Sequence, residues 1–163
     1  MKSVYLCGFM GCGKSHIGRQ LAKLLGCDFI DLDSYIEQRE GMTIAEIFEK
    51  HGEPYFRDAE AKYIREMPEN CVVATGGGAI INPNTAEAAR NAGKVVFLDA
   101  SFATCYALIK GDTRRPLVMK NTPEQLEELY NARRVVYRKN SSAIIGANGK
   151  DSDIVSEIVK MVK

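Results

Sequence analysis

The stretch "SVYLCGFMGCGKS", residues 3 to 15, decides the fold. It begins with a short apolar run typical of a buried strand, continues through three glycines and ends on a lysine and a serine. Gly8, Gly13, Lys14 and Ser15 match the pattern G-x-x-x-x-G-K-[ST], whose glycines let backbone N–H groups surround phosphates while the lysine reaches the terminal ones. A helix that begins directly after such a loop adds the positive end of its dipole. The stretch therefore predicts a nucleoside triphosphate site on a strand–loop–helix unit.

The composition is typical of one ordinary soluble domain spanning residues 1–163. Of the 163 residues, 45% are hydrophobic and 26% are charged, and the formal net charge is +1. So small a charge attracts neither nucleic acid nor an anionic membrane, and no apolar run approaches the ~20 residues of a membrane span or the design of a signal peptide. Five scattered cysteines without a C-x-x-C pair argue against a zinc site and a disulfide framework. We therefore expect a cytoplasmic protein without nucleic-acid or membrane partners, and a monomer by default.

Short β-branched runs alternate with helical patterns along the chain. Strands are predicted at 3–7, 28–33, 71–75, 94–99 and 142–146. Helices are predicted at 14–25, 43–50, 54–67, 123–139 and 153–162, and on both sides of the fourth strand. Strands without polar alternation are buried on both faces, and helices between them supply right-handed crossovers. We predict a three-layer αβα domain with a parallel sheet of about five strands, whose ligands bind beyond the carboxyl ends of the strands.

Two carboxylates follow the second predicted strand. Asp31 and Asp33 are two residues apart, so we predict that both point to the same face of the strand end. Beside a phosphate loop, one carboxylate can hold Mg²⁺ through water while the other accepts a hydroxyl proton. The alternative is a pair of ordinary turn residues. A GTPase is not favoured, because the sequence has no NKxD-type base-reading motif.

Arginines on otherwise apolar helical faces indicate a small anionic acceptor. At about 100° per residue, Arg133 falls within the apolar stripe of the helix at 123–139, whereas Arg134 lies toward its edge. Arg57 stands one turn before Glu60, which lies within the stripe of its own helix. A buried guanidinium needs an anion. That anion is either an internal carboxylate, which would make these arginines structural, or a substrate carboxylate gripped bidentately.

Two further segments complete the candidate site. A glycine triplet follows the third predicted strand: Gly76, Gly77 and Gly78. It lets backbone approach a ligand closely, although a plain turn is the alternative. The polar segment at 111–123 is either a solvent loop or a lid that closes over the donor and brings Arg115, in preference to Arg114, to the transferring phosphoryl group.

Taken together, these motifs resemble the shikimate kinase family. The resemblance covers almost the whole chain and rests on the ordered motifs "GFMGCGKS", "DLD", "FRDAE", "TGGGA", "RRPL" and "RRVVY". This family transfers the γ-phosphate of ATP to the 3-hydroxyl of shikimate in chorismate and aromatic amino-acid biosynthesis. Its P-loop kinase fold is like that of nucleoside monophosphate kinases, with strand order 2-3-1-4-5. The resemblance therefore implies ATP, shikimate and Mg²⁺ as ligands, acceptor-binding helices at about 33–67 and a lid at about 111–123.

The resemblance also implies roles for the candidate residues. Lys14 and Arg115 would act on the transferring phosphate, and Asp33 would be the base or proton acceptor. Ser15 and Asp31 would serve Mg²⁺. The nucleotide would be bound by Gly8, Gly11, Cys12, Gly13, Lys14, Ser15, His16, Lys110 and Arg115. The acceptor would be bound by Asp33, Arg57, Gly76, Gly77, Gly78 and Arg133.

Two departures from the family pattern fall on the nucleotide side. His16 stands where the family usually has Thr or Ser, and Lys110 stands where many members carry an arginine that stacks on adenine. Two alternatives to the shikimate kinase interpretation stay open from the residues alone: a gluconate-kinase-like sugar-acid kinase and a catalytically silent nucleotide-binding regulator. A nucleotide kinase would call for more lid arginines than this sequence has.

Overall fold

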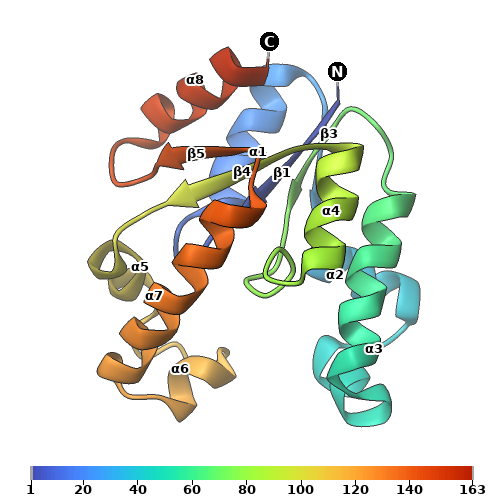
Figure 1. The fold of residues 1–163 in the computed structure, drawn as a ribbon, viewed down its shortest axis with the longest axis vertical. Coiled ribbons are helices and arrows are strands. Elements are labelled where there is room, and N and C mark those ends of the chain that lie inside the picture. Colours follow the sequence, from blue (N-terminus) through green and yellow to red (C-terminus); the bar gives the residue numbers. More distant parts are fainter. Residues whose placement is uncertain (1, 163) are drawn as a thin grey trace.

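Five parallel strands form one sheet at the centre of the protein, which is described over residues 2–162 by a computed structural model (Figure 1). The strands are β1 (Ser3–Cys7), β2 (Asp28–Asp31), β3 (Cys71–Ala74), β4 (Gly93–Asp99) and β5 (Ala143–Gly146). Their order is β2-β3-β1-β4-β5, and every neighbouring pair is parallel. The predicted parallel sheet with the order 2-3-1-4-5 is confirmed.

Helices cover both faces of this sheet. They are α1 (Lys14–Leu25), α2 (Leu32–Glu40), α3 (Ile44–Glu66), α4 (Pro83–Ala92), α5 (Phe102–Ile109), α6 (Pro116–Lys120), α7 (Pro123–Asn140) and α8 (Asp151–Val162). Helices α1 and α8 pack together on one face, whereas α4 and α7 pack on β4 from the other and α3 packs on α4 (Figure 1). The predicted three-layer αβα arrangement is confirmed. None of the helices within residues 2–162 is long and apolar enough to cross a bilayer.

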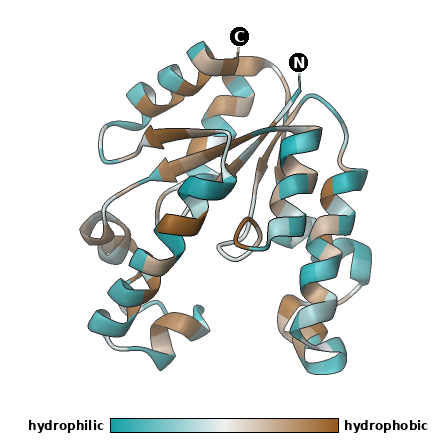
Figure 2. Cartoon of the chain, viewed as in Figure 1, coloured by the Kyte–Doolittle hydropathy of each residue, from teal (hydrophilic) through white to brown (hydrophobic). Residues whose placement is uncertain are grey.

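The hydrophobic core is built around the three inner strands. Every residue of β1 and β3 is buried, and so are most residues of β4. Figure 2 colours much of the sheet as hydrophobic. The edge strands differ: β2 is partly exposed along its length, and β5 alternates between exposed and covered residues. An edge strand has a neighbouring strand on one side only. The expectation of burial on both faces therefore holds for the inner strands alone.

The second strand ends earlier than the sequence pattern predicts. Strand β2 stops at Asp31, whose side chain accepts a 3.1 Å hydrogen bond from the backbone N–H of Ser34 and so caps α2. Asp33 lies in the first turn of that helix. The prediction that Asp31 and Asp33 share one face of a strand end is wrong, because the cap bends the chain into a helix that the sequence analysis did not predict.

Helix α3 contains both helices predicted between 43 and 67. It begins with a capping box, in which Thr43 and Glu46 each bond the other's backbone. Gly52, with φ of 83°, interrupts the helical backbone and bends α3 between the two predicted segments. In the segment at 111–123, given by the sequence analysis as either a solvent loop or a lid, the structure forms the short helix α6, which was not predicted.

Candidate functional site

The loop between β1 and α1 has a backbone shape that requires glycine. Gly8 and Gly11 have φ values of 148° and 82°, which L side chains rarely adopt. A Cβ atom on Gly8 would stand 2.9 Å from the carbonyl oxygen of Leu98, and one on Gly11 would stand 2.5 Å from that of Cys105. Both positions are therefore fixed by conformation and by space, and the loop folds tightly over the end of β1.

This loop concentrates positive charge at the start of α1. The ammonium group of Lys14 donates to the carbonyl oxygens of Gly8 at 2.6 Å and Phe9 at 3.3 Å, and it lies 3.8 Å from the sulfur of Cys12. Gly13 caps α1 without a side-chain hydrogen bond, so the cap supplies no acceptor to the first N–H groups of the helix. A cation and a helix N-terminus together favour a bound phosphate.

A cleft of about 460 Å³ extends from this loop to the carboxyl ends of β2 and β3. Its lining comprises Met10, Gly11, Gly13, Lys14, Ser15, His16, Arg19, Asp31, Asp33, Ala74, Thr75, Gly76, Gly77, Leu108 and Arg115. The cleft therefore joins residues predicted for the nucleotide to residues predicted for the acceptor and the metal. Its position beyond the strand ends is the one that a parallel sheet predicts.

The Asp33 carboxylate lies at the acceptor end of the cleft. An ideal Cβ at Gly76 would stand 2.9 Å from Oδ1 of Asp33, so the carboxylate lies directly against the glycine backbone. The pKa of Asp33 is raised to about 6, chiefly by burial and next by the nearby charge of Asp31, although the charges of Lys14 and Arg57 act to lower it. A carboxylate with this pKa is ionised at neutral pH and is suited to accept a proton.

The other two glycines of the triplet face the two predicted acceptor arginines. An ideal Cβ at Gly78 would stand 2.6 Å from Nη1 of Arg57, and one at Gly77 would stand 3.2 Å from Nη1 of Arg133. Gly76, Gly77 and Gly78 all have φ values outside the left-handed region. The triplet is therefore needed for space rather than for backbone conformation, and each glycine makes room for one candidate acceptor residue.

Arg57 is held by a buried acid on its own helix. Its Nη1 donates a 2.8 Å hydrogen bond to Oε1 of Glu60, and its Nε lies 3.5 Å from Oε1 of Glu53. Glu60 is 1% exposed, and burial raises its pKa to about 7 although the charge of Arg57 lowers it. The second carboxylate oxygen of Glu60 has no hydrogen-bond partner among the described residues. The internal ion pair considered for Arg57 is thus present, and it fixes the guanidinium beside Gly78.

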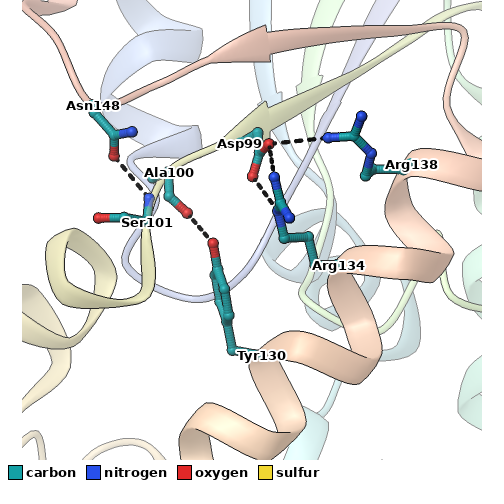
Figure 3. Close-up of polar contacts among 7 residues, drawn as sticks. All are labelled: Asp99, Ala100, Ser101, Tyr130, Arg134, Arg138 and Asn148. Atoms are coloured by element: carbon teal, nitrogen blue, oxygen red, sulfur yellow. Dashed lines mark hydrogen bonds and ion pairs between the residues drawn. The ribbon is translucent and has the colours of Figure 1, made fainter.

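The two adjacent arginines of α7 point to different places. Arg133 lies beside Gly77, and the neighbouring Tyr137 donates its hydroxyl to the Gly77 carbonyl. Arg134 instead donates from Nε and Nη2 to the two carboxylate oxygens of Asp99, at 2.9 and 2.8 Å (Figure 3). As the helical phase predicts, Arg133 rather than Arg134 faces the glycine triplet.

The two arginines before α6 also differ. Arg115 lines the cleft, and its Nε lies 3.2 Å from Oδ2 of Asp112. The Arg114 side chain is 88% exposed and pairs with the same Asp112 at 3.1 Å. Of these two arginines, only Arg115 belongs to the cleft lining formed by the described residues.

The two departures on the nucleotide side are placed differently. His16 lines the cleft, and its Nε2 lies 2.7 Å from Oδ2 of Asp151 and 3.1 Å from the amide nitrogen of Gln20. Lys110 is exposed at the C-cap of α5 and lies outside the cleft lining formed by residues 2–162. The structure therefore brings His16, but not Lys110, to the cleft.

Sequence reasoning missed several residues of the lining. Arg19 follows Ser15 by four residues on α1, and this spacing alone could have placed both on one face of the helix. Thr75 donates its hydroxyl to the carbonyl of Leu6 at 2.8 Å and so ties the residue before the triplet to β1. The backbone of that residue also donates to Leu6, at 3.0 Å. Neither bond leaves a recognisable pattern in the sequence.

Comparison with known proteins identifies the family of this chain. The sequence model described as "Shikimate kinase" matches residues 10–163. The shikimate kinase of Sulfurihydrogenibium sp. is 42% identical over 100% of this chain and 99% of its own length, and that of Geobacter sulfurreducens is 44% identical over 99% and 91%. The solved structure of the Acinetobacter baumannii shikimate kinase in complex with shikimate has a TM-score of 0.89 at 37% identity, covering 99% of this chain and 93% of its own. The chain belongs to the shikimate kinase family.

Proposed function

We propose that this protein transfers the γ-phosphoryl group of ATP to the 3-hydroxyl of shikimate, giving shikimate 3-phosphate and ADP. One observation carries the proposal. Each glycine of the triplet lies against one charged group, that of Asp33, Arg133 or Arg57, and Asp33, Gly76 and Gly77 also line the cleft beside the phosphate loop. A base and two guanidinium groups on one short backbone segment suit a compact hydroxy acid better than an open-chain sugar acid such as gluconate.

ATP would bind along the phosphate loop. Backbone N–H groups around Gly11, Cys12 and Gly13 would surround the phosphates, while the ammonium of Lys14 would exchange its carbonyl partners for phosphate oxygens. Gly8 would shape the loop from beneath, as its contact with Leu98 indicates. His16 would lie beside the α-phosphate. Lys110 would reach the adenine only from outside the cleft, so we expect it to contribute little to nucleotide affinity.

The residues present fit a magnesium ion shared with ATP. The Ser15 hydroxyl and the Asp31 carboxylate line the same cleft, and both offer the oxygen ligands that Mg²⁺ prefers. Within residues 2–162 no cluster of three or more His, Cys, Asp or Glu side chains could hold a metal alone. The remaining ligands would thus come from phosphate and water, with Asp31 acting in the outer shell. Bound Mg²⁺ neutralises charge that develops on the phosphoryl oxygens.

The acceptor would be held by its carboxylate and activated at its hydroxyl. Arg57 and Arg133 would bind the carboxylate of shikimate from two helices, and the backbone at Gly77 and Gly78 would border the ring. Asp33 would accept the hydroxyl proton on one carboxylate oxygen as the hydroxyl oxygen bonds to the γ-phosphorus and ADP leaves. Gly76 gives this carboxylate its place, because a side chain there would occupy the same space.

Segment 111–123 would act as a lid. Arg115 already lines the cleft, and closure would carry it onto the transferring phosphoryl group while excluding water that would compete with the hydroxyl. Segment 33–67 would carry the acceptor-binding helices. We further propose that the protein acts as a cytoplasmic monomer formed by one domain over residues 1–163.

A coupled ADP-release assay with ATP and Mg²⁺ tests the proposal. Shikimate, gluconate and a nucleoside monophosphate are compared as acceptors at equal concentration. We expect turnover with shikimate alone. Turnover with gluconate instead would support the sugar-acid kinase, and ATP binding without turnover on any acceptor would support the silent regulator.

A further inference from the structure

Asp99 forms an ion-pair cluster outside the cleft. It is the last residue of β4, and its side chain is 14% exposed. Its two carboxylate oxygens accept separate hydrogen bonds from Nε and Nη2 of Arg134, and Nη1 of Arg138 lies 3.5 Å away (Figure 3). A bidentate pair of this kind fixes the plane of the guanidinium as well as its position.

The cluster is one of three tethers on consecutive turns of α7. One turn before Arg134, the Tyr130 hydroxyl donates to the carbonyl oxygen of Ala100 at 2.6 Å, directly beside Asp99 (Figure 3). One turn after it, the Tyr137 hydroxyl donates to the carbonyl of Gly77. The spacings of four and three residues put the tethers along one side of the helix. Three tethers on one side set both the rotation of α7 about its axis and its position relative to β4 and the glycine triplet.

We propose that Asp99 is a positioning residue for the acceptor site, which acts by pairing with Arg134 and thereby orienting Arg133. Adjacent residues of a helix differ by about 100° around its axis, so fixing Arg134 on Asp99 directs Arg133 toward Gly77. Pairing with Asp99 also holds Arg134, the second arginine of the "RRVVY" motif, away from the glycine triplet. The inference rests on the proposed role of Arg133 in binding the acceptor carboxylate.

The two cations that contact Asp99 are more exposed than the carboxylate itself. The Arg134 side chain is 42% exposed, and that of Arg138 is 48% exposed. A bidentate pair on a carboxylate that is 14% exposed can add to the free energy of unfolding, whereas a single long contact such as that of Arg138 adds little. The orientation of a helix that carries a binding residue is more sensitive, because a small displacement of the guanidinium breaks a bidentate contact with the acceptor.

Asp99→Asn and Arg134→Lys test the inference. The first keeps the size of the side chain, and the second keeps the charge but loses the planar fork. We expect each to raise the KM for shikimate about tenfold, while kcat and the KM for ATP change less than about twofold. Shikimate binding measured by calorimetry, without turnover, is expected to weaken by the same factor. The double variant is expected to be no worse than the more damaging single one, because both remove the same pair.

Arg138→Gln is the matched control. It removes a cation from the same helix and the same carboxylate, but one whose contact is long and single. We expect its KM for shikimate to stay within about twofold of the wild-type value. Arg133→Lys, which alters the proposed acceptor ligand directly, is the reference for a damaged site.

The outcomes separate this inference from the proposed function. If the wild-type protein does not phosphorylate shikimate, the proposed function fails first. If it does, and Arg133→Lys raises the KM while Asp99→Asn and Arg134→Lys only lower the Tm, Asp99 is structural and the inference is overturned. A parallel loss of ATP affinity in either variant overturns it as well, because positioning of the acceptor predicts an effect on one substrate.

Discussion

Arg57 and Glu60 form an ion pair within one turn of α3, with Nη1 donating a 2.8 Å hydrogen bond to Oε1 of a carboxylate that is 1% exposed. The same guanidinium lies against Gly78. The acid therefore neutralises a cation that would otherwise repel Arg133 and Lys14 at the site, and it holds the guanidinium in one orientation. Arg57 can therefore form a structural ion pair with Glu60 and bind the substrate at the same time.

Glu60→Gln is expected to raise the KM for shikimate about three- to tenfold, because the amide holds Arg57 through a weaker, neutral hydrogen bond. Stability is expected to change little or to increase slightly at pH 8, since burial raises the pKa of Glu60 to about 7 and its ionised form is then costly. Steady-state kinetics and thermal melts measure the two effects. Asp58→Asn, an exposed position on the same helix, is the control. A large fall in Tm with an unchanged KM would contradict the proposed role.

The pKa of Asp33, raised to about 6 chiefly by burial, predicts opposite effects of pH on activity and stability. Turnover is expected to fall as the pH drops below about 6, because a protonated carboxyl group cannot accept the hydroxyl proton. The folded state binds this proton more tightly than the unfolded state does. The contribution to stability is therefore fully present below about pH 4 and is lost as the pH rises through 6.

Asp33→Asn is accordingly expected to abolish turnover, to leave ATP binding nearly intact and to stabilise the protein at pH 7.5. The gain follows from a pKa shift of about two units and is on the order of 1–3 kcal/mol. Denaturant melts at pH 7.5 and pH 4 should show the gain only at the higher pH. Retained turnover would refute the role of Asp33, and an equal gain at both pH values would refute the proposed origin of its stability effect.

The glycine triplet predicts a graded series of alanine variants. Gly78→Ala would place a Cβ 2.6 Å from Nη1 of Arg57, whereas Gly77→Ala would place one 3.2 Å from Nη1 of Arg133. Both neighbours are the ends of flexible side chains, so the arginine moves and the fold survives. We expect the KM for shikimate to rise more in Gly78→Ala than in Gly77→Ala, with ATP binding unchanged in both. Equal, small effects would indicate that the triplet is a plain turn.

Asp31→Asn distinguishes two roles of Asp31, as the N-cap of α2 and as a negative charge beside the proposed magnesium ion. Asparagine is as good an N-cap as aspartate, so the hydrogen bond to Ser34 is retained and α2 is expected to stay folded. The Mg²⁺ concentration for half-maximal activity is expected to rise several-fold. Because the charge of Asp31 raises the pKa of Asp33, the acidic limb of the pH–rate profile should also move to lower pH. If Asp31 were only a cap, the Mg²⁺ requirement would stay unchanged and only the pH–rate profile would move.

The sequence predicts most of the sheet because its strands are apolar runs that end in recognisable signals. The glycine loop and Thr43 determine where α1 and α3 begin, and the structure follows both. Helix α2 escaped prediction because only Leu32 and Ile36 of its nine residues are buried, too few for a clear helical period. The predicted strand continues to residue 33, past the N-cap at Asp31 where β2 ends. The sequence analysis therefore places Asp33 in a strand, whereas it lies in the first turn of α2.

Which residues belong to the candidate site was easier to predict than which of them contact one another. Helical phase was enough to separate Arg133 from Arg134, because one angle decides which of two neighbours faces inward. The pairing of Arg134 with Asp99 depends on the packing of α7 against β4, and the two residues are 35 apart in sequence. Side-chain contacts across such distances leave no local pattern, so the positioning role of Asp99 emerges only from the structure.

The two arginines of the proposed lid provide a matched pair, because both contact Asp112 but only Arg115 of the two lines the cleft. Arg115→Ala is expected to lower kcat at least a hundredfold, since an arginine that stabilises the transferring phosphoryl group is worth that much or more in related chemistry. Arg114→Ala is expected to change kcat less than about threefold, because its side chain is 88% exposed and its ion pair is a surface one. Single-turnover measurements of phosphoryl transfer distinguish a chemical effect from slower lid opening. The opposite ranking would mean that closure rotates Arg114 inward. Equal losses in both variants would instead assign the effect to Asp112, the acid that they share.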